Sequence, residues 1–115
     1  MRERNRALTV FPALLLALLL TGCPEQVTIA EVNRDPGRYA NKDVAVRGRV
    51  VDSFGVFQTG VYQLDDGTGR LWVFSDRYGV PGEGAQVEVA GRIIPTLTFS
   101  GRSFTNILRE NQRRR

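Results

Sequence analysis

From Lys42 onward, apolar residues recur at every second position of the chain, which is the spacing of a strand with one buried face. In the first run the inward positions are Val44, Val46, Gly48 and Val50. Four further runs predict strands at residues 61–64, 71–74, 86–94 and 103–108. Turns are expected between them, at residues 65–69, 78–84 and 96–101. Five short strands at this spacing predict a small all-β sandwich or barrel.

A short helix is expected before the first strand. Thr28 and Glu31 have the spacing of a capping box, in which each side chain accepts a hydrogen bond from the other residue's backbone N–H. Ile29 and Val32 are three residues apart and therefore share one helical face. The sequence Asp-Pro-Gly at 35–37 ends the helix, and we expect Tyr39 to pack back on the strands.

The first 22 residues have the organisation of a signal peptide. Three arginines near the start precede an apolar run at residues 7–20, which is shorter than the roughly 17–25 residues of a membrane-spanning helix. An alternative is a buried N-terminal helix with an incidental cysteine. The run ends in Leu20-Thr21-Gly22-Cys23, which resembles the lipobox of bacterial lipoproteins. The resemblance implies cleavage before Cys23, with acyl chains on its sulfur and on the new amino terminus.

This interpretation divides the chain into a signal peptide at 1–22, a lipidated tether at 23–27, a folded domain at 28–109 and a basic tail at 110–115. Residues 109–115 are expected to be frayed. The mature protein would be held by lipid on the periplasmic side of a cell-envelope membrane, or on the cell surface. Pro24 stands where aspartate would favour inner-membrane retention, so the outer membrane is favoured in an organism with two membranes.

The ordered strand motifs resemble OB-fold domains, and most nearly the tRNA-anticodon type with its small secreted and lipoprotein relatives in bacteria. The motifs are Lys42-Asp43-Val44-x-Val46-x-Gly48-x-Val50, Tyr62-x-Leu64-x-Asp66-Gly67-Thr68-Gly69-x-Leu71-x-Val73 and Gly84-x-x-Val87-x-Val89-x-Gly91. The resemblance implies a five-stranded Greek-key barrel that binds ligands around its second and third strands.

Charge and composition narrow the function classes. The formal net charge is +4, but residues 23–112 hold 10 basic and 11 acidic side chains. Nucleic-acid-binding domains usually carry a basic patch on the fold itself, which this balance does not favour. The chain has no histidine and one cysteine, so the commonest general base is missing. Asp65 and Asp66, the only adjacent carboxylates, are explained by a turn. We expect no enzymatic activity, cofactor or metal.

The candidate ligand-binding face follows from strand parity. If Leu71 and Val73 point into the barrel, Trp72 and Phe74 point outward. By the same parity, the outer face also carries three polar side chains: Arg47, Arg49 and Gln63. In OB domains, aromatic residues on this surface stack bases and cations hold phosphates, and a sugar or a peptide could use it too.

Several interpretations remain open from the sequence. Trp72 and Phe74 could instead be covered by the N-terminal segment through Ile29, Val32 and Tyr39. The leading functional hypothesis is a lipid-anchored OB module that binds a protein or another envelope component through the Trp72/Arg47 face. One alternative is binding of single-stranded nucleic acid, and another is a structural role as an accessory lipoprotein of an envelope machine.

Overall fold

The valine-rich run predicted as the first strand forms a long, curved strand, β2 (Asp43–Val56), in the computed structural model, which describes residues 24–114. Its first half pairs with β5 (Gln86–Phe99) and its second half with β3 (Thr59–Asp65). A bulge between Val50 and Asp52 marks the change of partner. At Gly48 an added Cβ would lie 2.9 Å from the Asp65 carbonyl oxygen, so the close approach of β2 to β3 requires glycine.

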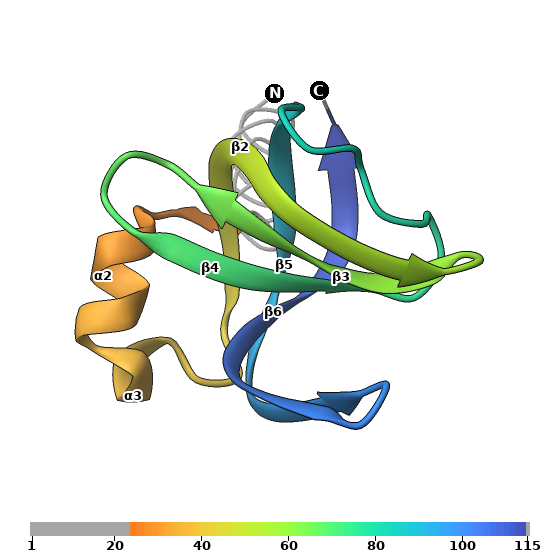
Figure 1. The fold of residues 1–115 in the computed structure, drawn as a ribbon. Coiled ribbons are helices and arrows are strands. Elements are labelled where there is room, and N and C mark those ends of the chain that lie inside the picture. The colour runs from red at the N-terminus through yellow and green to blue at the C-terminus, as the bar shows by residue number, and fades with distance from the viewer. Residues whose placement is uncertain (1–23, 115) are drawn as a thin grey trace, which may run out of the picture.

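The strands close into a barrel (Figure 1). Its hydrogen-bonded order is β2-β3-β4-β6-β5, and β5 pairs back with β2. β4 (Arg70–Ser75) lies parallel to β6 (Arg102–Arg114), whereas the other barrel pairs are antiparallel. This architecture confirms the predicted all-β, five-stranded OB-type Greek-key barrel. A sixth, two-residue strand, β1 (Glu25–Gln26), pairs in parallel with the start of β2.

The barrel interior is filled by the apolar side chains that alternate along the strands. They include the predicted inward residues of the first strand and of the third, and the register places Leu64 opposite Leu71 and Tyr62 opposite Val73. The fully buried members with the largest side chains are Tyr62, Ile29, Leu64, Ile93 and Leu108. Alternation of buried and exposed residues therefore predicted the main core.

Two short helices close one end of the barrel: α2 (Ile29–Arg34) and α3 (Pro36–Tyr39). The capping box of Thr28 and Glu31 is present as predicted. Ile29, Val32 and Tyr39 are buried against the barrel core. The Asp-Pro-Gly sequence at 35–37 was expected only to end the first helix, but α3 begins within it, at Pro36.

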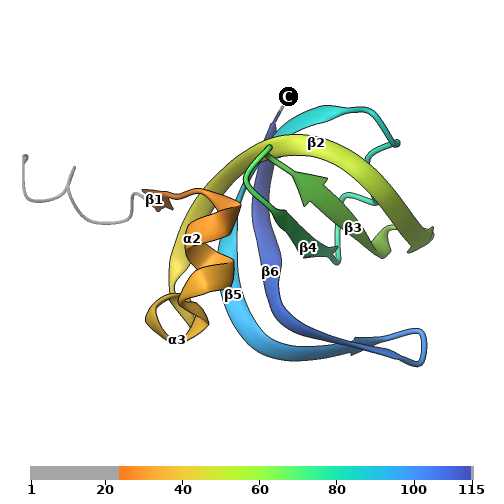
Figure 2. The same cartoon turned by 60° about the vertical axis from the view of Figure 1, so that its left-hand side comes forward.

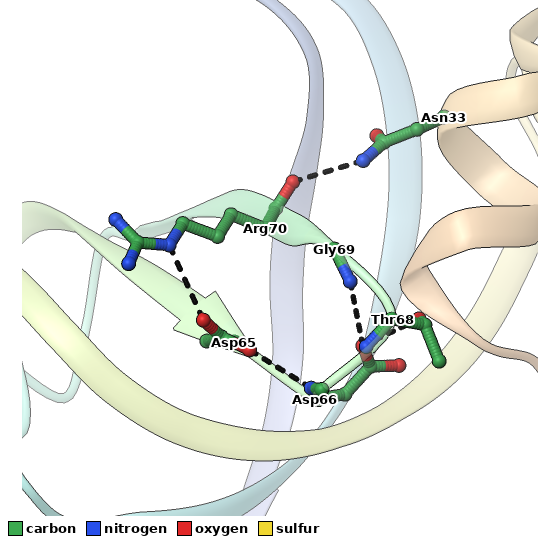
Figure 3. A network of polar contacts seen from close by, with 7 residues as sticks. Asn33, Asp65, Asp66, Thr68, Gly69 and Arg70 are labelled. Atoms are coloured by element: carbon green, nitrogen blue, oxygen red, sulfur yellow. Dashed lines mark hydrogen bonds and ion pairs between the residues drawn. The ribbon is translucent and has the colours of Figure 1, made fainter.

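The β3–β4 turn holds α2 in place, and Figure 3 shows its polar contacts. The Asp66 carboxylate accepts hydrogen bonds from the backbone N–H groups of Ile29 (2.9 Å) and Thr68 (2.8 Å). Partial burial disfavours the charged form of Asp66, but these donors outweigh burial and keep its pKa below the ordinary value. The backbone N–H of Gly67 and the Arg70 guanidinium likewise lower the pKa of Asp65. Both aspartates therefore serve the turn and the helix.

Three expected boundaries differ in the structure. The turn predicted at 96–101 shrinks to Ser100 and Gly101, both at positive φ, because residues 96–99 and 102–105 continue the β5–β6 ladder. Residues 110–114, expected in a frayed basic tail, belong to β6, and Glu110 is buried. Residues 25–27, expected in a tether, belong to the fold, because β1 pairs with β2 and the Val27 N–H donates to the Ala45 carbonyl (3.0 Å).

The predicted signal peptide and Cys23 lie outside the described residues. Within 24–114, neither helix has the length and apolar character needed to cross a bilayer.

Candidate functional site

The outer face of β3 and β4 carries the aromatic residues singled out from the sequence. Leu71 and Val73 point into the barrel, and Trp72 and Phe74 point to the outside, as parity predicted. The register places Gln63 beside Trp72 and Val61 beside Phe74 on this outer face. Trp72, Phe74 and Gln63 are therefore neighbours, and all three are only partly exposed.

A hairpin arm, formed by the end of β5 and the start of β6 (residues 96–105), folds over this face (Figure 2). The ring of Phe104 lies 5.2 Å from that of Trp72, and the ring of Phe99 lies 6.0 Å from that of Phe74. Phe99 also makes an edge contact with Phe54 at the end of β2, with a centroid distance of 5.9 Å. These pairs have the spacing of favourable aromatic contacts and form a second apolar cluster outside the barrel.

The alternative that the N-terminal segment covers Trp72 and Phe74 is wrong about which segment covers them. Ile29, Val32 and Tyr39 do not cover them, because these three side chains belong to the core cluster of the barrel. The hairpin arm supplies the cover instead. A segment that was expected to be a turn therefore builds one wall of the candidate site.

Between the hairpin arm and the β2–β3–β4 face lies an open groove of about 320 Å³. Its walls include Phe54, Trp72 and Phe104, and its charged lining residues are Asp52 and Arg102. The Arg102 guanidinium lies 5.1 Å from the ring centroids of both Trp72 and Phe104, a cation–π arrangement. Within residues 24–114, neither Asp52 nor Arg102 is part of an ion pair. One cation and one anion are thus available to a ligand in the same groove.

The two arginines proposed from the sequence lie away from Trp72. Arg49 is exposed and lies between Asp65 of β3 and Gln86 of β5, just before the bulge in β2. Arg47 pairs with Glu88 of β5 at 3.4 Å, and Arg114 contacts the same carboxylate at 3.3 Å. The hydrogen bond from Arg114 lowers the pKa of Glu88 most, and the positive charge of Arg47 lowers it further. Arg47 therefore belongs to a different surface from the groove.

Sequence reasoning missed Arg102, Asp52 and the phenylalanines of the hairpin arm. The signal for Arg102 and for the two phenylalanines was the alternation of Leu97 with Phe99 and of Arg102 with Phe104, which continues both flanking strands. The assumption of a turn at 96–101 hid it.

A buried polar network at the other end of β6 was also missed. The Tyr62 hydroxyl (2.5 Å) and the Ser75 hydroxyl (2.8 Å) both donate to the Glu110 carboxylate. Arg113 donates to Glu110 (3.2 Å) and to the carbonyl oxygens of Gly79 (3.0 Å) and Tyr78 (3.2 Å). Burial, followed by the Glu110 carboxylate, raises the pKa of Tyr62 above its ordinary range. Because Arg113 of β6 bonds both Glu110 and the carbonyl oxygens of Tyr78 and Gly79, this network fastens the 76–84 loop to the barrel. Every buried polar side chain of residues 24–114 has a hydrogen-bond partner.

Residues 24–114 contain no group of three histidine, cysteine or acidic side chains placed to hold a metal ion. The groove offers aromatic surface, one guanidinium and one carboxylate, a set of groups suited to binding.

Comparisons with known proteins concern the fold. No protein-family model matches the chain, and no curated protein matches it. Among solved structures, the chain is similar to a protein assigned as an aspartyl-tRNA synthetase from Leishmania major Friedlin, with a TM-score of 0.60 and 15% sequence identity. The match covers 80% of this chain and 20% of the Leishmania chain, so the protein corresponds to about a fifth of that enzyme. At this identity the likeness shows the fold alone: the chain is an OB-type barrel.

Proposed function

We propose that this protein is a non-enzymatic, lipid-anchored binding module of the bacterial cell envelope that holds an extended segment of a partner protein in the groove beneath the hairpin arm. The observation that carries the proposal is the presence of both Arg102, stacked on Trp72 and Phe104, and Asp52 in one aromatic groove.

The chemistry of the groove favours a peptide. Arg102 can donate to a carboxylate or a backbone carbonyl, and Asp52 can accept from a backbone N–H or a cationic side chain. Aromatic residues and arginine are the residue types that contribute most to protein–protein binding. The volume of about 320 Å³ is at the small end of ligand pockets, which are about 300–1,000 Å³. The groove therefore suits a few side chains of an extended segment.

The anchor is proposed from the Leu20-Thr21-Gly22-Cys23 sequence. One acyl chain gives only marginal membrane binding, whereas two or more hold a protein stably, so acylation of Cys23 would keep the barrel at the membrane. The proposed location is the periplasmic side of the outer membrane in a cell with two membranes.

Binding of single-stranded nucleic acid is the second candidate. The OB-type barrel and the aromatic side chains at the tip of β2 and β3 support it, with Phe54 half-exposed and Phe57 98% exposed. The carboxylate of Asp52 in the groove opposes it, because a phosphate chain would approach a negative charge. A purely structural role in an envelope machine would give a stable complex that does not depend on the groove.

The test compares Arg102→Ala with Arg47→Ala, since both replace an exposed arginine and only Arg102 lines the groove. Partners crosslinked in intact cells should be lost with Arg102→Ala and retained with Arg47→Ala. Equal capture by both variants and the wild type would reject the groove as the binding site.

Trp72 is the only tryptophan, so its fluorescence reports occupancy of the groove directly. Quenching by a short single-stranded oligonucleotide that persists at physiological salt would favour nucleic acid. Quenching that disappears with salt would reflect only nonspecific attraction to phosphates.

A further inference from the structure

The surface around Pro24 differs in character from the groove. Cross-strand neighbours on β2, β5 and β6 form three rows there, which we call the anchor face: Arg47, Glu88 and Arg114; Ala45, Ala90 and Gln112; Asp43, Arg92 and Arg109. Small side chains in the middle row leave a shallow hollow, which Pro24 lines together with Ala45, Ala90 and Gln112.

One peptide bond separates Cys23 from Pro24, which lines this face. Cys23 is bonded to Pro24, and adjacent Cα atoms of a trans peptide are about 3.8 Å apart. Beyond Pro24, β1 is paired with β2, and the buried Val27 donates its N–H to Ala45. An acyl group on Cys23 would therefore hold the edge of the anchor face within a few ångströms of the lipid headgroups.

The charges of the anchor face suit a negative membrane surface. Glu88 is shared by Arg47 and Arg114, Asp43 pairs with Arg92 and Asp76 pairs with Arg109. Counting Asp76, which is not one of the nine residues of the face, three carboxylates are paired with four guanidiniums, so one guanidinium is in excess. An arginine close to an anionic lipid surface is attracted to it, so the excess guanidinium favours contact with anionic headgroups.

We propose that, when Cys23 is acylated, the barrel rests with the anchor face on anionic lipid and turns the groove toward the aqueous compartment. Figure 2 shows β1 on one side of the barrel and the tip of the hairpin arm on the opposite side. This orientation rests on the proposed anchor, and it would leave the groove open to a partner that is not itself in the membrane.

The test uses two labelled variants of the full lipoprotein, Gln112→Cys on the anchor face and Ser103→Cys on the hairpin arm. Both positions are exposed and lie on β6, near its two ends, so they differ mainly in whether they belong to the anchor face or to the hairpin arm. Each protein is expressed with its signal sequence and purified from membranes, so that acylation blocks the Cys23 sulfur and a thiol-reactive fluorophore labels only the introduced cysteine. The labelled protein is reconstituted into vesicles of phosphatidylcholine and phosphatidylglycerol that contain nitroxide-headgroup lipid. We expect severalfold stronger quenching at position 112 than at position 103.

Mass spectrometry of Cys23 and flotation of a Cys23→Ser variant separate the two levels of the proposal. Acylated protein that floats with vesicles but shows equal quenching at both positions, or stronger quenching at 103, would overturn the orientation and leave the anchor intact. Absence of acyl chains on Cys23 would overturn the anchor and the orientation together.

Discussion

Replacing Arg113 by alanine tests the buried network at the end of β6. The Glu110 side chain is fully buried and that of Arg113 is 16% exposed, so the pair is almost entirely removed from water. In Arg113→Ala, Glu110 keeps its bonds from Tyr62 and Ser75 but loses the one cation that pairs with it within residues 24–114, and the carbonyls of Tyr78 and Gly79 lose a donor. Leaving one charge of a buried pair without its partner costs about 3–5 kcal/mol.

That loss is large for a domain of this size, because the free energy of unfolding of a whole protein is about 5–15 kcal/mol. The assay is urea unfolding followed by the fluorescence of Trp72, the only tryptophan. The matched control is Arg114→Ala, since Arg114 is the next residue and its side chain is 78% exposed in its ion pair with Glu88. An exposed pair of this kind contributes about 0–1 kcal/mol.

The double variant Glu110→Gln/Arg113→Ala separates charge from packing. Glutamine removes the buried charge, and its amide oxygen can accept from one of the two hydroxyls while its N–H donates to the other. The double variant should therefore be more stable than Arg113→Ala alone. If Arg113→Ala destabilised the protein no more than Arg114→Ala, the network would not exist in solution and the explanation given for the end of β6 would be refuted.

Three further substitutions test the barrel and its helix. Gly91→Ala would drive a Cβ into the Arg109 carbonyl oxygen, so it should prevent normal β5–β6 pairing, whereas Gly37→Ala, with open space around it, should fold normally by circular dichroism. Thr28→Ala removes the N-cap of α2 and should lower the free energy of unfolding by about 1 kcal/mol in urea titrations, and an unchanged midpoint would contradict the capping role. The lowered pKa of Asp66 means that its contribution to stability is complete above its unfolded-state pKa of about 3.9 and is lost as pH falls through the lower folded-state value. Asp66→Asn should therefore be less stable at neutral pH and should lose less stability on acidification below pH ~4; parallel pH profiles of the two proteins would contradict this.

Local patterns predicted those parts of the fold that depend on neighbouring residues. The capping box at Thr28 and the inward alternation from Val44 to Val50 each follow from a short stretch of chain. Strand parity also correctly turned Trp72 away from the barrel interior.

The candidate site could be predicted only in part, because its composition depends on how distant segments curve. Parity placed Arg47 on the outer face, but the bulge after Val50 makes β2 change partners, so Arg47 lies beside β5 and Asp52 lies beside β3. Arg102 reaches Trp72 only because the hairpin arm folds over β3 and β4. No periodicity in the sequence encodes that curvature.

Photo-crosslinking from the groove tests the central claim most directly. A photoreactive amino acid is introduced at the exposed position 100, which lines the groove, and in a second protein at the exposed position 83, which does not. Both lipoproteins are irradiated in intact cells. A ligand-binding groove predicts a discrete adduct from position 100 that is absent from position 83 and disappears with Arg102→Ala. Adducts of equal yield from both positions, or an adduct from position 100 that survives Arg102→Ala, would contradict it.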